Sequence, residues 1–175
     1  EAVELCRSMF GEVLPTFEGR YYQVQEARNL PRPVQPGGPP ILIGGGGERR
    51  TLRLVARYAD FCNITGGVDT IRHKVGVLRE HCEAVGRDPA TVTVSVLSTL
   101  VLTDSAEETK GTWELLRSAA GAAGDAADSF TVGQEDEVAA HVEELAAAGV
   151  DYFIFNMPTS GADAVRRAGA LLAPL

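Results

Sequence analysis

The chain has 175 residues, of which 45% are hydrophobic and 23% are charged, a balance typical of globular domains and not of disordered proteins. No apolar run approaches the roughly 20 residues that span a bilayer, and the net charge of −8 argues against nucleic acid or an anionic membrane as a partner. The three cysteines, Cys6, Cys62 and Cys82, form no CxxC pair, which favours reduced thiols in the cytoplasm and predicts no metal site.

The first forty residues differ from the rest of the chain. The opening EAVELCRSMFGE has the pattern of an amphipathic helix already under way, ends at Gly11 and lacks an initiator Met, so we expect the chain to be cut from a longer protein. Residues 12–40 are rich in Pro and Gly, and FEGRYYQVQEA predicts a short hairpin whose aromatic residues pack down. The predicted organisation is one partial domain over 1–175, with a helix and an irregular excursion over 1–40 and βα units over 41–175.

From Pro40 onward, short apolar segments alternate with amphipathic ones. The apolar segments predict strands at 41–44, 60–64, 91–102 and 151–156. The amphipathic segments predict helices at 48–59, from Asp69 as N-cap to Gly86, from a capping box of Ser105 and Glu108, at 134–149 and at 162–173, with a loop at 121–128. Apolar strands separated by helices favour a parallel sheet covered by helices.

Four βα units are visible in this pattern. They fit either a small open sheet or half of an eight-unit TIM barrel, and periodicity does not choose between the two. In both cases we expect the four strands to lie side by side in chain order, because parallel strands are joined by right-handed crossovers.

The glycine run Gly44–Gly47 lies between a predicted strand and a predicted helix. Glycine lets the backbone approach a ligand, and the first N–H groups of a helix have no internal partner, so this junction predicts a phosphate site. Arg50 belongs to a basic cluster that follows, and arginines early in a helix oppose its macrodipole unless an anion lies nearby. A flexible turn before a solvated helix is the alternative. The dinucleotide motif GxGxxG fails at Arg49, and no P-loop lysine follows.

A second candidate site is the segment DFCNITGG, at the carboxyl end of the next strand. Asn63 and Thr65 offer hydrogen-bonding groups there, and active sites of TIM barrels lie on this face. The alternative is a turn that caps its own backbone. Asn156 ends the fourth strand, and Met157 beside it is expected to pack. No nucleophile–base pair emerges, which favours an enzyme whose cofactor carries the chemistry.

Three further stretches accompany the glycine segment: FEGRYYQVQEA, LREHCEAVGRDP and TVGQEDEVAAHVEELAAAGVDYFIF. Together with PRPVQPGGPPILIGGGGERRTLRLVARYADFCN, they resemble the luciferase-like monooxygenases, especially the branch dependent on coenzyme F420. The resemblance runs over nearly all 175 residues.

The resemblance implies a TIM barrel of which this chain supplies roughly strands five to eight, the carboxy-terminal half. It also implies that Gly44, Gly45, Gly46 and Gly47 contact the cofactor phosphate, with Arg50 beside them, and that Asn63, Ile64 and Thr65 lie near the ribityl chain or the substrate. Four glycines depart from the commoner Gly-Gly-Ser-Gly form, so which of them touches phosphate stays open. The ring-binding and proton-handling residues of the family lie mostly in the first half of the barrel.

The function expected from this resemblance is hydride transfer between coenzyme F420 and a small organic substrate, in a cytoplasmic homo-oligomer such as a dimer. FMN in place of F420, in a monooxygenase of the same superfamily, is one alternative, and a non-catalytic half-barrel is the other. An open half-barrel leaves sheet edges and apolar surface uncovered, so the isolated chain is expected to be inactive and either poorly soluble or oligomeric.

Overall fold

A computed structural model describes residues 1–120, 129–157 and 161–173 of the chain. Its helices are α1 (Ala2–Gly11), α2 (Thr51–Tyr58), α3 (Val68–Ala84), the 3-10 helix η1 (Pro89–Thr91), α4 (Ala106–Ala120), α5 (Glu135–Ala147) and α6 (Ala162–Leu172). Its strands are β1 (Phe17–Glu18), β2 (Gln23–Val24), β3 (Leu42–Gly44), β4 (Phe61–Ile64), β5 (Thr93–Leu102), β6 (Phe130–Gly133) and β7 (Tyr152–Asn156). The predicted helices and strands are thus present with small shifts at their ends, whereas the predicted loop at 121–128 lies outside the described residues.

The four predicted strands form one parallel sheet in the expected order, β3, β4, β5 and β7. The register aligns Gly44 with Asn63, Asn63 with Ser95 and Ser95 with Tyr152, so these four residues form one row across the sheet. The prediction that these four strands are parallel and lie side by side in chain order is therefore confirmed.

Strand β6 was not predicted from the sequence. It pairs in parallel with the last four residues of β5, from Thr99 to Leu102. Strand β4 covers β5 only as far as Val96, so the longer β5 presents a free edge near its carboxyl end. The short segment Phe130–Gly133 pairs with that edge. This pairing is possible only because β5 is longer than β4.

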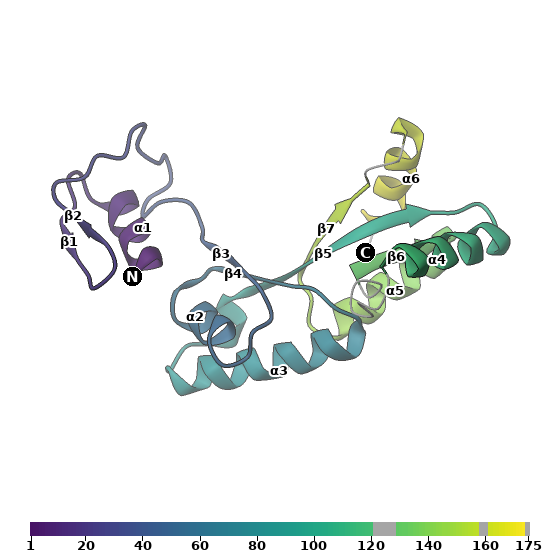
Figure 1. The fold of residues 1–175 in the computed structure, drawn as a ribbon, viewed down its shortest axis with the longest axis horizontal. Coiled ribbons are helices and arrows are strands. Elements are labelled where there is room, and N and C mark those ends of the chain that lie inside the picture. Colours follow the sequence, from purple (N-terminus) through teal and green to yellow (C-terminus); the bar gives the residue numbers. More distant parts are fainter. Residues whose placement is uncertain (121–128, 158–160, 174–175) are drawn as a thin grey trace.

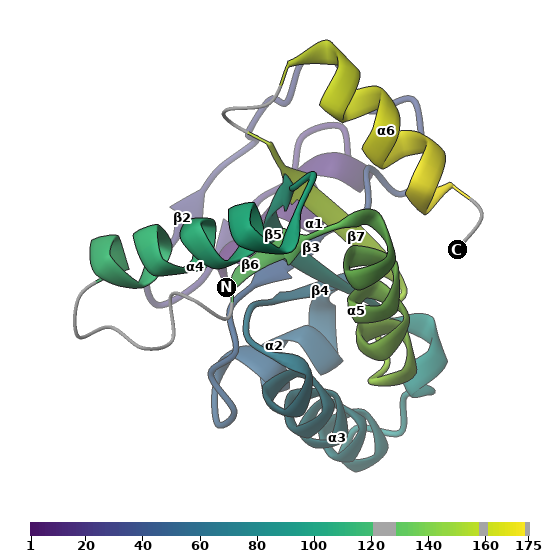
Figure 2. The ribbon, with the colours of Figure 1, turned by 90° about the vertical axis from the view of Figure 1, so that its right-hand side faces the viewer.

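The helices α2, α3 and α5 cover one face of the sheet (Figure 1), and Figure 2 gives the view turned by 90°. Side chains of successive strand residues point to opposite faces, and alternate residues such as Cys62, Val94 and Phe153 pack with α2, α3 and α5. The residues of opposite parity form what we call the helix-free face: Leu42, Gly44, Phe61, Asn63, Thr93, Ser95, Leu97, Thr99, Tyr152, Ile154 and Asn156. This face exposes large apolar groups, with Tyr152 at 54% and Leu97 at 43% of their accessible surface.

The amino-terminal segment lies to one side of the sheet, beyond β3 (Figure 1). The predicted hairpin is present as β1 and β2, paired antiparallel. The prediction that its aromatic residues pack down is wrong for Tyr21, which is 74% exposed, and for Tyr22. Helix α1 instead anchors this segment, because Arg7 donates to the carboxylate of Asp60 at 3.1 Å.

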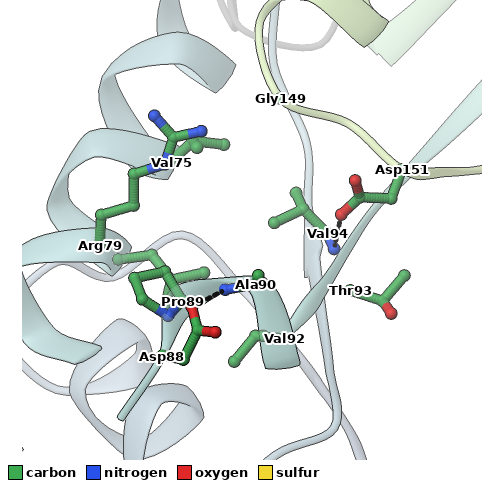
Figure 3. A pocket seen from close by; sticks show the side chains of 11 residues that line it. Val75, Arg79, Asp88, Pro89, Ala90, Val92, Thr93, Val94, Gly149 and Asp151 are labelled. Atoms are coloured by element: carbon green, nitrogen blue, oxygen red, sulfur yellow. Dashed lines mark hydrogen bonds between the residues drawn. The ribbon is translucent and has the colours of Figure 1, made fainter. Parts of the chain in front are cut away.

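A cleft of about 650 Å³ lies at the amino-terminal edge of the sheet, between α3, η1 and the turn before β7 (Figure 3). Its two carboxylates serve the backbone: Asp151 accepts from the N–H of Val94 at 2.8 Å, and Asp88 accepts from the N–H of Ala90 at 3.0 Å. These acids therefore hold the ends of η1 and β5 in place.

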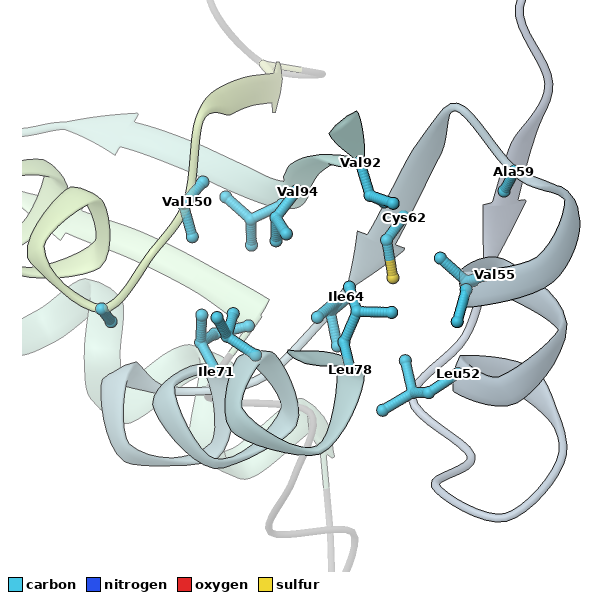
Figure 4. Close-up of a cluster of buried hydrophobic side chains, with 14 of the residues drawn as sticks. Leu52, Val55, Ala59, Cys62, Ile64, Ile71, Leu78, Val92, Val94 and Val150 are labelled. Carbon is cyan, nitrogen blue, oxygen red and sulfur yellow. The ribbon is translucent and has the colours of Figure 1, made fainter. Parts of the chain in front are cut away.

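The main core lies between the sheet and the helices α2, α3 and α5 (Figure 4). Leu52, Ile64 and Ile71 have no exposed surface, and Cys62 and Cys82 are buried among them. Full burial of a side chain as large as Leu or Ile contributes roughly 1.5–3 kcal/mol. This packing fixes α2 and α3 against β4, and so it positions the two loops that precede these helices.

Candidate functional site at the carboxyl ends of β3 and β4

The loops that follow β3 and β4 lie side by side, because the strands are parallel neighbours. The backbone N–H of Gly45 donates to the carbonyl oxygen of Asn63 at 2.9 Å, which ties the start of the first loop to strand β4. The structure thus brings together the two sites that the sequence predicted separately. The N–H of Gly45 is already bonded in this arrangement and is not free for a ligand.

The four glycines are in different surroundings. Gly45 has φ = +122°, a backbone conformation that strains any other residue. A Cβ on Gly47 would lie 2.9 Å from Oγ1 of Thr51, and a Cβ on Gly46 would make ordinary contacts of 3.5 Å with Ile64 and Lys74. A Cβ on Gly44 would meet no atom within 4 Å. The backbone conformation therefore requires glycine at 45, and a side chain at 47 would displace the Thr51 hydroxyl, whereas Gly44 has open space beside it.

Helix α2 begins later than predicted. Glu48–Arg50 form a turn, and the helix starts at Thr51 with Arg50 as an N-cap residue whose side chain makes no capping hydrogen bond. The basic cluster comprises Arg49, Arg50, Arg53 and Arg57, which are all exposed. Among the residues that the structure describes, none of the four forms an ion pair with a carboxylate. The amino end of α2 therefore has no side-chain cap and carries an excess of positive charge, although the N–H of Leu52 already donates to the carbonyl oxygen of Gly47 at 3.0 Å.

The loop after β4 has a similar construction. Thr65 is exposed, Gly66 has φ = +137°, and Gly67 is the N-cap of α3, again without a side-chain cap. The prediction that Asp69 caps this helix is wrong. The two glycines let the helix start two residues earlier, so Asp69 lies in the first turn and accepts a hydrogen bond from Arg72 at 2.6 Å.

Ser95 is a site residue that sequence reasoning missed. It lies in β5 beside Asn63, is fully buried, and its Oγ accepts a hydrogen bond from Nδ2 of Asn63 at 3.0 Å. Ser95 in turn donates to the carbonyl oxygen of Cys62 at 3.2 Å. These two bonds orient the Asn63 amide on the helix-free face. The polar alternation of Thr91, Thr93 and Ser95 is visible in the sequence, but only the register places Ser95 beside Asn63.

A charged cluster from α3 adjoins the glycine loop. Oε1 of Glu48 accepts from Nζ of Lys74 at 2.6 Å and lies 3.1 Å from Nε2 of His73. The carbonyl oxygen of Glu48 lies 2.8 Å from Nε2 of His81. The hydrogen bond from Lys74, and then that from His73, hold the pKa of the Glu48 carboxyl below its ordinary value. Glu48 is therefore a carboxylate at neutral pH, directly after the four glycines.

Asn156 lies apart from these loops. It ends β7 and pairs with Thr99, four residues beyond Ser95 along β5 and hence roughly 13 Å further along the strand direction. Its neighbour Met157 packs against the smaller core formed by Leu100, Val138 and Ala168, as expected for a packing residue.

Among the described residues, no group of three or more His, Cys, Asp or Glu is arranged to hold a metal ion. In that same part of the chain, no helix is long and apolar enough to cross a membrane. Burial raises the pKa of the Cys62 thiol to about 11, so this cysteine is an inert core residue.

Residues 1–117 match the model of the luciferase-like monooxygenase family, and the chain belongs to this family. The F420-dependent glucose-6-phosphate dehydrogenase of Kineococcus radiotolerans is 37% identical over 90 residues, which are 50% of this chain and 26% of that protein. The chain thus matches only about a quarter of this relative's length.

Solved structures of the same fold extend over almost the whole chain. The coenzyme F420 dependent tetrahydromethanopterin reductase from Methanopyrus kandleri superposes with a TM-score of 0.80 at 16% identity, over 98% of this chain and 60% of that one. Riboflavin lyase with modified FMN and riboflavin superposes with a TM-score of 0.79 at 15% identity, over 98% of this chain and 55% of that one. The predicted fold class, an α/β half of a TIM barrel, is thereby confirmed.

Proposed function

We propose that the two loops after β3 and β4 bind the phosphorylated ribityl chain of coenzyme F420, as part of an oxidoreductase that moves hydride between F420 and a small organic substrate. The observation that carries this proposal is that two glycine loops, each followed by a helix without a side-chain cap, lie at the carboxyl ends of the paired strands β3 and β4. Uncapped N–H groups at two adjoining helix starts favour an anion between them.

The residues divide this work among them. The backbone N–H groups of Gly46, Gly47 and Glu48 would hold the phosphate, and Arg50 would add positive charge at the start of α2. Gly44 leaves room for the ribityl chain at the helix-free face, where the amide of Asn63, held by Ser95, offers its oxygen to a hydroxyl. Thr65 extends the polar edge of the second loop. When bound, the deazaflavin supplies the hydride donor or acceptor.

FMN is the second candidate cofactor. The relative from Kineococcus and the Methanopyrus reductase are named for F420, whereas the riboflavin lyase structure contains modified FMN. Both cofactors end in a phosphorylated ribityl chain, so the same loops serve either. We further propose that the whole protein acts in the cytoplasm as a homo-oligomer, such as a dimer, on a small molecule.

The test compares phosphorylated and dephosphorylated ligands on the same protein. The parent chain is titrated with FMN and riboflavin, and with F420 and its dephosphorylated core. Gly44→Val places a bulky side chain in the open space at the loop, and Gly76→Val is the matched control, because a Cβ at Gly76 also meets no atom within 4 Å. We expect the parent to prefer the phosphorylated form by at least about ten-fold, the strength of one charge-assisted hydrogen bond.

Gly44→Val should weaken binding of both forms at least ten-fold, while Gly76→Val binds as the parent does. Thermal unfolding of both variants shows whether either substitution has disturbed the fold. Equal affinity of the parent for both forms would sink the phosphate assignment. Normal binding by Gly44→Val would place the cofactor elsewhere, and absence of all binding would favour a non-catalytic half-barrel.

A further inference from the structure

Glu48 poses an electrostatic problem for an anion site. Its carboxylate lies at the end of the glycine run and is 42% exposed. A negative charge close to a phosphate repels it, and at a partly exposed position that repulsion is reduced by solvent but not removed. A carboxylate at this position is compatible with phosphate binding only if a nearby cation neutralises it.

Lys74 is the side chain that does so. Its Nζ lies 2.6 Å from Oε1 of Glu48, and only 20% of the side chain is exposed. Its alkyl chain runs alongside the loop, since a Cβ on Gly46 would lie 3.5 Å from Cε and 3.9 Å from Cδ of Lys74. The ammonium group is therefore held between the glycine loop and the carboxylate.

The arginines of α2 do not have this position. Arg50, Arg53 and Arg57 are exposed on the surface of their own helix, where water and salt screen their charge. Lys74 comes from a different element, α3, and its side chain is largely shielded from solvent beside the loop. A half-buried ammonium interacts more strongly with an anion than an exposed guanidinium at a similar distance does.

We propose that Lys74 supplies the cation of the phosphate site at Gly44–Gly47 and that Glu48 is its built-in counter-ion. Glu48 holds the ammonium beside the loop, and a bound phosphate competes with the carboxylate for it. This inference rests on the proposed function, because it assigns a residue to the same phosphate site.

Lys74 and Glu48 are expected to have opposite effects on phosphate binding. An ion pair that only stabilised the fold would give the same effect whichever partner was removed. Lys74→Met removes the cation and leaves the Glu48 carboxylate without its main partner, so it should lower the preference for FMN over riboflavin about ten-fold or more. Glu48→Gln removes the competitor and should leave that preference equal to or above the parent value. The double variant should recover part of what Lys74→Met loses.

The experiment is a double-variant cycle on the full chain, with FMN and riboflavin affinities measured for each protein. Arg79→Met is the matched control, because it removes one positive charge from an exposed position on the same helix. Riboflavin affinity should be the same in all variants, whereas a misfolded variant would lose affinity for both ligands. Added inorganic phosphate should compete with FMN in the parent and less so in Lys74→Met.

Three results would overturn the proposal. If Lys74→Met keeps the parent preference while Gly44→Val loses binding, the loop is the site but Lys74 has no part in it. If Glu48→Gln loses as much preference as Lys74→Met, Glu48 acts as a latch for the loop and not as a counter-ion. A parent chain without preference for FMN over riboflavin would reject the proposed phosphate site itself, and this inference with it.

Discussion

The starts of helices α2 and α3 differ from the starts of α4 and α5. At α4 and α5, side chains accept hydrogen bonds from the backbone N–H groups near the start of the helix. At α4, Ser105 accepts from the N–H of Glu108 at 3.2 Å, and the Glu108 carboxylate accepts from the N–H of Asp104 at 2.8 Å. At α5, the Glu137 carboxylate accepts from the N–H of Gln134 at 2.9 Å. At α2 and α3, no side chain caps the helix: the N-cap of α2 is Arg50, which follows the glycine run, and the N-cap of α3 is Gly67.

This difference shows where a ligand can bind on an otherwise repetitive scaffold. A helix start that its own side chains satisfy is complete without a partner and excludes an anion, because acids already occupy the positive end of the dipole. An uncapped start behind a glycine loop leaves N–H groups for water or a ligand. The capped starts of α4 and α5 therefore serve stability, and the uncapped starts of α2 and α3 carry the proposed site. Helix α6 also begins without a side-chain cap, at Gly161, but lies outside that site.

The largest effect on stability is expected from Gly45→Val. Its φ of +122° is available to glycine and strains a β-branched residue, so we expect a loss of about 1–3 kcal/mol in the free energy of unfolding. Urea denaturation measures it. Gly46→Ala is the matched control, because its Cβ makes only ordinary contacts, and it should stay within about 0.5 kcal/mol of the parent. Equal losses in the two variants would contradict this reading of the loop.

A smaller effect is expected at the capped junction. Glu137→Ala removes the acceptor of the Gln134 N–H and should cost about 1 kcal/mol of stability, as is usual for a lost cap. Cofactor affinity should not change, since this helix start is not part of the site. A variant with unchanged stability but weaker FMN binding would reverse the roles assigned to the two kinds of junction.

The smallest expected effect is on the reactivity of Cys62. Strand β4 presents Asn63 to the helix-free face and Cys62 to the core. Because burial raises the pKa of Cys62 to about 11, its thiol stays protonated at pH 8 and should resist alkylation in the folded protein. The exposed Cys6 should react. Mass spectrometry after labelling at pH 8 that finds Cys62 modified as fast as Cys6 would show that β4 opens.

The same raised pKa predicts how stability depends on pH. In the unfolded chain the Cys62 thiol ionises near pH 9.0, so Cys62 disfavours folding as the pH rises from there toward 11.

The structure departs from the sequence pattern for two different reasons. Strand β6 has no clear local signal, because its pairing depends on how far β5 extends beyond β4. The other departures lie at helix starts, where local pattern is weakest. Asp69 precedes the apolar pattern and is predicted as a cap, whereas Gly66 and Gly67 allow an earlier helix start. Ser105 caps α4 as predicted, but the Glu108 carboxylate bonds to the N–H of Asp104 and not to that of Ser105.

The sequence by itself determined the four βα units and the glycine loop, because hydrophobic periodicity and glycine runs are local properties of the chain. The family followed from the resemblance of several motifs in order along the chain. Only the tertiary structure decided which glycines the chain itself requires, that Ser95 orients Asn63, and that Lys74 lies beside Gly46 with Glu48 as its partner. These contacts join residues 26 to 32 positions apart. They depend on strand register and on the packing of α3 against α2, which arise from the whole core and from no single segment of sequence.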